Sequence, residues 1–346
     1  MFFLITISLS LNLQGQQWSL SEVGTLPEAV SNNAICEGLV GDSPFVFSFG
    51  GLDKTKIYTG IHLRSFRFNT LSGKSERIPD LPDTLGKVAA GASNVKGKIY
   101  IIGGYHVFSN GSELSSNKVH RYDPQSNSYL TDGTPVPVAI DDHVQAVWRD
   151  SLIYVITGWS DKANVPAVQI YNPAKDRWMT GTSTPDDHQY KSFGASGVIR
   201  GDTIFYFGGA SMGKNFPIQN QLRVGIINPE NPAEIEWSVE TPDEQITGYR
   251  MASVLVDEQV QWLGGSEVTY NYNGIAYNKT GGVPPAGRVL ILDSTQNPKL
   301  TYMKVSGLPM DLRGIASISN SVKYLAGGML AGQEVTNKIF KLEWKK

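Results

Sequence analysis

The chain has 346 residues, of which 40% are hydrophobic and 10% aromatic, so it can bury a sizeable core. Thirty basic and 32 acidic residues leave a net charge of −2, which gives no reason to expect a nucleic acid or an anionic membrane as a partner. The 36 glycines and 18 prolines favour many short strands and turns over long helices.

Residues 1–15, MFFLITISLSLNLQG, form an apolar run that ends near small residues. Such a run is typical of a secretory signal peptide, although it lacks the usual basic residue near its start. The alternative is an N-terminal core strand, which would be unusually long. No later stretch has the length of a membrane-spanning helix. We therefore expect residues 16–346 to form one exported domain, periplasmic or extracellular, without membrane insertion.

Six apolar runs follow, and each ends in a glycine pair or a close variant of one. They span residues 45–51, 99–104, 153–158, 204–209, 260–265 and 322–328, with Thr157 in place of the first glycine in the third run. An alternating apolar run before a glycine pair predicts a short buried strand and a sharp exit. The first positions of the pairs are 50, 103, 157, 208, 264 and 327, so the period is near fifty residues. Six copies at this period indicate a repeat architecture.

The second repeat shows the order of strands within one unit. Small residues at 88–95 suit a crowded inner strand, 99–102 form the second strand, 117–124 the third with its turn, and 127–129 begin the fourth. The sequence therefore predicts an all-β, six-bladed propeller with four antiparallel strands per blade. The chain ends at 337–344 without a fourth strand, whereas a spare strand lies around Trp18. We expect that N-terminal strand to close the last blade, because a ring of sheets would otherwise leave open edges.

The glycine pair, a tyrosine about eighteen residues later (Tyr122, Tyr171) and an aromatic residue six or seven further on (Tyr129, Trp178) resemble kelch repeats. The resemblance covers nearly all of the chain after residue 15 and is strongest in the second and third repeats. It implies a propeller closed by a terminal strand. It does not imply one function, because one fold hosts many activities.

Fourteen residues before the pair, the second to sixth repeats place Ala89, His143, Gly194, Arg250 and Arg313. Arg250 and Arg313 at matched positions predict a site for an acidic ligand, since guanidinium groups bind carboxylates in bidentate fashion. The alternative is that they pair with nearby aspartates in a wet channel lining. Further candidate ligand-binding residues lie beside these positions and after the glycine pairs: Lys87, Asp142, Tyr190 and Trp159.

The tripeptide Asp-Asp-His occurs at 141–143 and again at 186–188. Asp142, His143, Asp187 and His188 are weak candidates for a metal site, since carboxylates and imidazoles bind divalent transition metals. The two copies are offset by six residues relative to the glycine pairs, which favours turn or cap roles instead. We therefore predict no metal and no cofactor.

A long insertion follows the fifth glycine pair and carries Tyr270 and Tyr272 among asparagines. Aromatic faces with amide groups suit sugars, but the insertion also fits a lid that packs on its neighbours. The nucleophile elbow, the phosphate-binding loop, the zinc signature and the dinucleotide fingerprint are all missing from the sequence.

These features predict an exported, monomeric propeller that binds a carbohydrate, another acidic small molecule or a protein at its channel mouth. At the level of fold and length the chain is also similar to the N-acetylneuraminate mutarotase (epimerase) family, which interconverts sialic acid anomers. That similarity implies an alternative in which Arg250 and Arg313 hold the substrate carboxylate and Glu267 or His143 is the acid/base group. The family's pairing of an acid with an arginine on one blade loop has no clear counterpart in this sequence.

Overall fold

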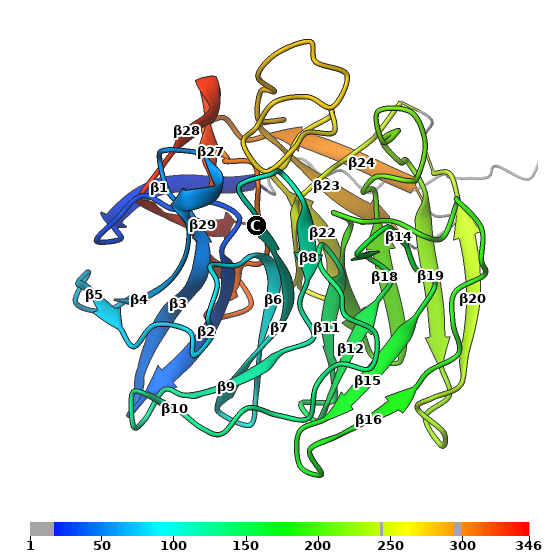
Figure 1. The fold of residues 1–346 in the computed structure, drawn as a ribbon, viewed down its shortest axis with the longest axis horizontal. Helices are drawn as coiled ribbons and strands as arrows, with labels where there is room; N and C mark the ends of the chain where they lie inside the picture. The colour runs from blue at the N-terminus through cyan, green and yellow to red at the C-terminus, as the bar shows by residue number, and fades with distance from the viewer. Residues whose placement is uncertain (1–16, 243–244, 294–298, 346) are drawn as a thin grey trace, which may run out of the picture.

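The computed structural model describes residues 17–242, 245–293 and 299–345. Within these residues the strands form six antiparallel sheets arranged as the blades of a propeller (Figure 1). The predicted six-bladed fold is confirmed. The predicted signal peptide, residues 1–15, lies outside the described residues. None of the helical segments that the structure describes is long and apolar enough to cross a bilayer.

Blades 1 to 3 follow one another along the chain. Blade 1 contains β2 (Ala34–Val40), β3 (Ser43–Leu52), β4 (Ile61–Asn69) and β5 (Ser75–Ile78), with the 3-10 turn η1 (Tyr58–Gly60) before β4. Blade 2 contains β6 (Val88–Val95), β7 (Lys98–Val107), β9 (Val119–Asp123) and β10 (Ser128–Tyr129), and β8 (Glu113–Ser115) pairs with the end of β7. Blade 3 contains β11 (Val144–Trp148), β12 (Leu152–Ile156), β15 (Val168–Asn172) and β16 (Arg177–Thr180). The segment that connects β12 to β15 forms a separate hairpin of β13 (Trp159–Ser160) and β14 (Ala163–Asn164).

Blades 4 and 5 repeat the same order, and blade 6 differs in its outer strand. Blade 4 contains β17 (Ser196–Arg200), β18 (Thr203–Phe207), β19 (Leu222–Ile227) and β20 (Ile235–Glu240). Blade 5 contains β21 (Ala252–Val256), β22 (Gln259–Leu263), β23 (Arg288–Asp293) and β24 (Lys299–Lys304). Blade 6 contains β25 (Ala316–Ser317), β26 (Val322–Ala326), β29 (Lys338–Lys345) and β1 (Gln17–Thr25), with β27 (Met329–Leu330), η2 (Ala331–Gln333) and β28 (Glu334–Val335) between β26 and β29.

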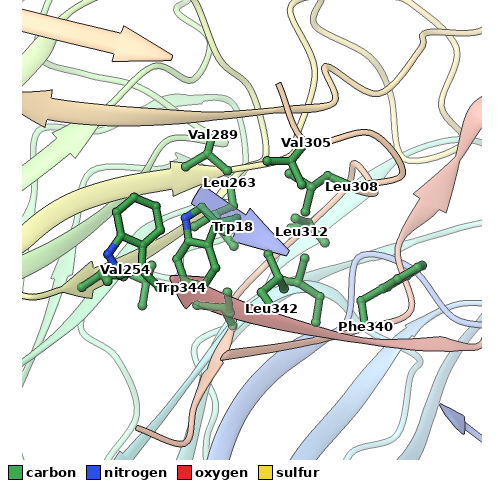
Figure 2. Packing of buried hydrophobic residues seen from close by; sticks show 14 of the residues in the cluster. Trp18, Val254, Leu263, Val289, Val305, Leu308, Leu312, Phe340, Leu342 and Trp344 are labelled. Carbon is green, nitrogen blue, oxygen red and sulfur yellow. The ribbon is translucent and has the colours of Figure 1, made fainter. Parts of the chain in front are cut away.

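The N-terminal strand closes the ring as predicted. β1 lies beside β29 (Figure 1) and pairs with it antiparallel. In this register Trp18 lies opposite Trp344. The two indole rings have centroids 5.2 Å apart, and Trp18 Nε1 donates to Gln261 Oε1 in blade 5 at 2.8 Å. Figure 2 shows this pair packed among aliphatic side chains of blades 5 and 6. Closure therefore buries the Trp18 side chain as well as pairing an edge.

The core consists of apolar layers between neighbouring blades. One layer joins the central strands of blades 2 and 3, where Ile102 and Ile153 are fully buried. This arrangement explains why the second strand of each repeat is a continuous apolar run: both of its faces pack against another sheet.

The glycine pairs satisfy a backbone requirement at the end of each second strand. Gly103 has φ +68°, and a Cβ there would approach the Ile140 carbonyl oxygen to 2.3 Å. In blade 3, Thr157 keeps the left-handed backbone with φ +47°. Its hydroxyl donates to the Val165 carbonyl at 3.0 Å and accepts from Ser192 N at 3.0 Å. These hydrogen bonds offset the unfavourable backbone of a β-branched residue.

Candidate functional site

A closed ring of backbone hydrogen bonds surrounds one end of the channel. Each blade contributes one residue with a left-handed backbone near the start of its inner strand: Asn32, Ala89, Asp142, Gly194, Arg250 and Asp311. The bonds run from Ala89 N to Asn32 O, Asp142 N to Ala89 O, Gly194 N to Asp142 O, Arg250 N to Gly194 O, Leu312 N to Arg250 O and Asn32 N to Asp311 O, at 2.8–3.2 Å. The ring places six residues at equivalent positions around the axis.

Counting fourteen residues back from each glycine pair predicts that His143, Arg250 and Arg313 occupy equivalent positions. For His143 and Arg313 this prediction is wrong. Asp142 is the ring residue of blade 3, and Asp311 is the ring residue of blade 6. The stretch between ring and glycine pair is one residue longer in blade 3 and two longer in blade 6 than in blades 2, 4 and 5. The loop lengths therefore place two carboxylates where the spacing predicts an imidazole and a guanidinium.

Three ring residues, Asp142, Arg250 and Asp311, form a buried charge quartet with Arg313. Arg250 donates from Nη2 to Asp142 Oδ2 at 2.8 Å and from Nη1 to Asp311 Oδ1 at 3.1 Å. Arg313 forms an ion pair with Asp142 through Nη2 and donates from Nε to Asn32 Oδ1 at 2.6 Å. Blades 3 and 6 are opposite each other in a six-membered ring, so the Asp142–Arg313 pair crosses the axis.

Aromatic rings enclose the quartet from the side. The Arg250 guanidinium lies 5.0 Å from the Tyr249 ring centroid and 5.2 Å from that of Tyr270. The Tyr270 hydroxyl donates to Asp311 Oδ1 at 3.5 Å. Burial alone would raise the pKa of Asp142, but Arg250 and Arg313 outweigh it and the pKa is lowered. The two arginines are thus neutralised by carboxylates of the chain itself, which is the alternative that the sequence left open.

Two cavities meet this layer. The channel, about 390 Å³, is lined by the inner strands and includes His143 and Arg313. The second cavity, about 310 Å³, lies among the loops that follow the second strands and includes Asp142 and Arg250. We call it the mouth cavity. It is lined by Tyr105, Gly111, Glu113, Asp141, Asp142, Trp159, Asp161, Phe193, Phe216, Arg250, Asn271 and Tyr277.

One part of the mouth cavity wall is aromatic. Trp159, Phe193 and Phe216 contact one another edge to face, with ring centroids 5.4–5.6 Å apart. Tyr277 of the long blade 5 insertion packs on Phe216 at 4.7 Å. The insertion projects from the loop face between β22 and β23 (Figure 1). It therefore supplies a side chain to the cavity as well as packing on its neighbours.

Another part of the wall carries the acidic residues Glu113, Asp141, Asp142 and Asp161. Asp141 accepts from Ser115 Oγ at 2.5 Å. Burial, and then repulsion from Asp142, raise the pKa of Asp141 well above its ordinary value. Burial also raises the pKa of Glu113. Repulsion from Asp142 adds to this effect, and attraction to Arg250 opposes it. Among the described residues, Glu113, Asp141 and Asp161 form no ion pair with a basic side chain.

His143 and Glu267, the predicted acid/base candidates, lie away from the mouth cavity. His143 lines the channel, and its Nε2 contacts Gln145 Oε1 at 3.1 Å. Burial lowers the pKa of His143 to about 4, with Arg313 adding to the effect. The Glu267 side chain is 54% exposed, forms an ion pair with Arg288 and lines a separate surface hollow beside Lys214. The structure thus does not bring Glu267 together with Arg313.

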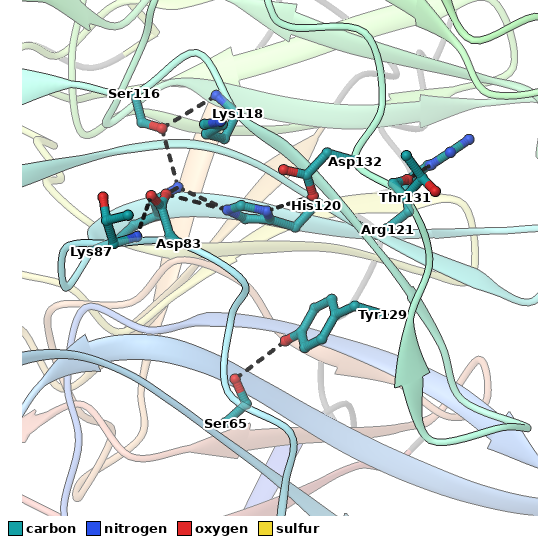
Figure 3. A network of polar contacts seen from close by, with 11 residues as sticks. Ser65, Asp83, Lys87, Ser116, Lys118, His120, Arg121, Tyr129, Thr131 and Asp132 are labelled. Carbon is teal, nitrogen blue, oxygen red and sulfur yellow. Dashed lines mark hydrogen bonds and ion pairs between the residues drawn. The ribbon is translucent and has the colours of Figure 1, made fainter.

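Lys87 lies in a buried network inside blade 2, shown in Figure 3. Its Nζ is 2.7 Å from Asp83 Oδ2 and 3.1 Å from His120 Nε2. Because an ammonium only donates, His120 Nε2 accepts and Nδ1–H donates to Asp132 Oδ1 at 2.9 Å. Burial lowers the pKa of Lys87, against the attraction of Asp83. Lys87 is absent from the lining of the mouth cavity.

The remaining predicted residues are dispersed. Trp159 lines the mouth cavity, whereas Tyr190, Tyr270 and Tyr272 do not. Tyr190 is half-buried, and its carbonyl oxygen accepts from the Tyr206 hydroxyl at 3.0 Å. Tyr270 is fully buried beneath Arg250, and Tyr272 packs beside it at the edge of the same apolar cluster.

The second Asp-Asp-His copy, residues 186–188, occupies a loop between blades 3 and 4. His188 is 73% exposed and its Nδ1 lies 3.1 Å from Asp187 Oδ1 of the same loop. In the part of the chain that the structure describes, no three His, Cys, Asp or Glu side chains are arranged to hold a metal ion. In the first copy, Asp142 is engaged by two arginines instead.

Sequence reasoning missed Glu113, Asp161 and Phe216 as cavity residues, whereas Tyr277 belongs to the insertion that the sequence singled out. All four lie between the second and third strands of their repeats, on the predicted binding face. Their position between these strands was the only feature of the sequence that could have identified them. The loops differ in length and share no motif, so aligning the repeats does not show which of their side chains lie close together.

Comparisons with known proteins agree with this architecture. A family model described as the kelch motif matches residues 87–129. Kelch-like protein 36 of Bos taurus is 24% identical over 113 residues, which are 33% of this chain and only 17% of that protein. The solved structure titled "Structure of YjhT" superposes with a TM-score of 0.71 at 16% identity, covering 94% of this chain and all of that one. The chain is a six-bladed β-propeller whose second repeat matches the kelch motif.

Proposed function

We propose that this propeller binds a carbohydrate in the mouth cavity. The observation that supports the proposal is that an aromatic wall and a set of carboxyl groups face one cavity of about 310 Å³. Sugar rings bind proteins through their apolar C–H faces on aromatic rings and through hydroxyl groups that bond to polar side chains. Trp159, Phe216 and Tyr277 offer the first kind of contact. Asn271, Asp141 and Glu113 offer the second.

The charge quartet argues against a carboxylate as the recognised group. A bidentate arginine clamp needs a guanidinium with two free donors. Arg250 already binds Asp142 and Asp311, and Arg313 binds Asp142 and Asn32. A ligand carboxylate would have to displace a buried aspartate from its partners, which costs several kcal/mol. We therefore propose a sugar without a carboxylate, in place of the acidic ligand expected from the sequence.

The test is a titration of the protein with a panel of neutral, amino and acidic monosaccharides, followed by NMR. We expect dissociation constants between micromolar and millimolar for part of the panel. The variants Trp159→Ala and Phe216→Ala should weaken binding at least tenfold. Tyr302→Ala is the matched control, because Tyr302 is 54% exposed on the outer strand β24, outside the mouth cavity. Absence of binding across the panel would overturn the proposal.

The raised pKa values of Asp141 and Glu113 in one cavity favour a second candidate, a sugar mutarotase. The distant similarity to the sialic acid mutarotase family points to the same reaction class. Glu113 would take the proton of the anomeric hydroxyl while Asp141 gives a proton to the ring oxygen. The ring C–O bond then breaks, the open-chain carbonyl forms, and closure on its other face reverses both proton transfers. Glu113 and Asp141 replace Glu267 and His143 in this proposal.

Mutarotation is tested by the rate at which a freshly dissolved single anomer reaches equilibrium, followed by NMR. The protein should accelerate equilibration of a sugar that it binds, and Asp141→Asn should abolish the acceleration. Equilibration at the uncatalysed rate, with binding intact, would leave the binding function and overturn the enzymatic one. Export of the chain remains a proposal that rests on the apolar residues 1–15.

A further inference from the structure

The mouth cavity carries carboxyl groups that no basic side chain of the described residues neutralises. Asp142 and Asp311 are balanced by Arg250 and Arg313 within the quartet. Glu113, Asp141 and Asp161 remain in the wall, and Arg250 is the only lysine, arginine or histidine among the described lining residues. Three carboxyl groups therefore face the cavity without a cationic partner.

Two of these carboxyl groups are held together by one serine. Ser115 of β8 donates from Oγ to Asp141 Oδ2 at 2.5 Å and from its backbone N to Asp161 Oδ1 at 3.2 Å. The backbone N of Asp161 donates in turn to Ser115 Oγ at 2.9 Å. Like charges fixed side by side repel one another, and a cation placed between them relieves that repulsion.

A second observation points to a ligand. Arg250 is 1% exposed and lines the cavity, yet its Nε has no hydrogen-bond acceptor among the described residues. An unsatisfied donor on a buried charged group is costly, and a ligand hydroxyl oxygen would satisfy it. The aromatic wall formed by Trp159, Phe216 and Tyr277 adds ring faces that attract a cation.

Resting on the proposed carbohydrate function, we propose that the mouth cavity selects a sugar that bears a protonated amino group. The ammonium lies against Glu113, Asp141 and Asp161, the sugar ring lies on the aromatic wall, and a ring hydroxyl accepts from Arg250 Nε. The same carboxyl groups disfavour an acidic sugar, because its carboxylate would enter a negative field with both arginines already engaged.

The experiment compares sugars that differ only in the charged group. The probes are glucose, glucosamine, N-acetylglucosamine and glucuronate, with the four galactose counterparts to separate hydroxyl configuration from charge. Titrations at neutral pH and low ionic strength should show the amine bound at least tenfold more tightly than its N-acetyl derivative. Added salt should reduce that ratio, because screening weakens charge attraction.

Substitutions of acidic residues test whether the mouth cavity causes the preference for an amine. Glu113→Gln combined with Asp161→Asn should lower the ratio of amine to N-acetyl affinity at least fivefold. Asp42→Asn should leave the ratio unchanged, because Asp42 is an exposed acid in the turn between β2 and β3, at the opposite end of the blade. Circular dichroism and thermal melting establish that each variant is folded.

The outcomes separate the two proposals. Binding of neutral or N-acetylated sugars as tightly as the amines would overturn the inference and leave carbohydrate binding in place. Tighter binding of glucuronate or galacturonate than of the amino sugars would also overturn the inference and leave carbohydrate binding in place. No binding by any of the eight sugars would overturn both.

Discussion

The guanidinium of Arg250 in blade 5 donates to Asp142 in blade 3 at 2.8 Å, passing over the blade that lies between them. The ring residue of that blade is Gly194, whose missing side chain leaves room for the Tyr249 ring. Asp142 also pairs with Arg313 of blade 6, so one buried carboxylate connects three blades. The quartet is a cross-brace at the channel end.

Loss of the central carboxylate should destabilise the protein strongly. Asp142→Asn leaves Arg250 and Arg313 with uncompensated charge in a buried site, so we expect a loss of about 3–5 kcal/mol in the free energy of unfolding. Urea denaturation measures it. Arg313→Met added to Asp142→Asn should recover part of the loss, because it removes one unpaired cation. Additive losses in the double variant would contradict the proposed coupling.

Gly194 should be intolerant of a side chain for two separable reasons. It has φ +68°, and a Cβ would lie 2.3 Å from Tyr249 Cε2. Gly41 has φ +57° with open space around the Cβ position. Gly41→Ala therefore reports backbone strain alone, about 1 kcal/mol, and Gly194→Ala should cost about 1–3 kcal/mol more. Equal losses in thermal or urea unfolding would show that Tyr249 moves aside freely.

Removal of the closing indole should weaken the whole ring. Trp18 is buried against Trp344 and donates to Gln261 across the blade 5–6 boundary. Trp18→Ala should cost about 3–5 kcal/mol through lost burial, an unfilled cavity and an orphaned amide. Gln17→Ala, on the exposed neighbouring position of β1, is the control and should change stability by less than about 0.5 kcal/mol. A wild-type melting temperature for Trp18→Ala would mean that strand closure contributes little.

His143 should make the protein acid-sensitive. Its folded pKa of about 4 lies below the ordinary 6.5, so the neutral imidazole is the form that folding favours. This contribution is fully present above pH 6.5 and is lost as the pH falls toward 4, by a total of about 3 kcal/mol. His143→Gln should flatten this part of the stability profile, while His188→Gln, at a 73% exposed position, should retain it. Parallel profiles for the wild type and His143→Gln would contradict the assignment.

Much of the architecture could be predicted from the sequence because it depends on local patterns. Apolar alternation, glycine pairs and the spare strand at Trp18 each act within one repeat or at one edge, and six copies reinforce the same interpretation. The ring residues could not be identified by comparing the repeats. One or two extra residues before a glycine pair place Asp142 at the axis where the spacing predicts His143, and Asp311 where it predicts Arg313.

The sequence by itself therefore determined the six blades, their strand order and the strand that closes them. Only the tertiary structure decided which charged side chains meet at the channel end. Arg250 and Arg313 meet Asp142 and Asp311 and are neutralised, while Glu113 and Asp161 reach the mouth cavity from separate segments and have no cationic partner among the described residues. Coulomb energy varies with distance in space, and residues far apart in the chain set those distances through the loops and the ring.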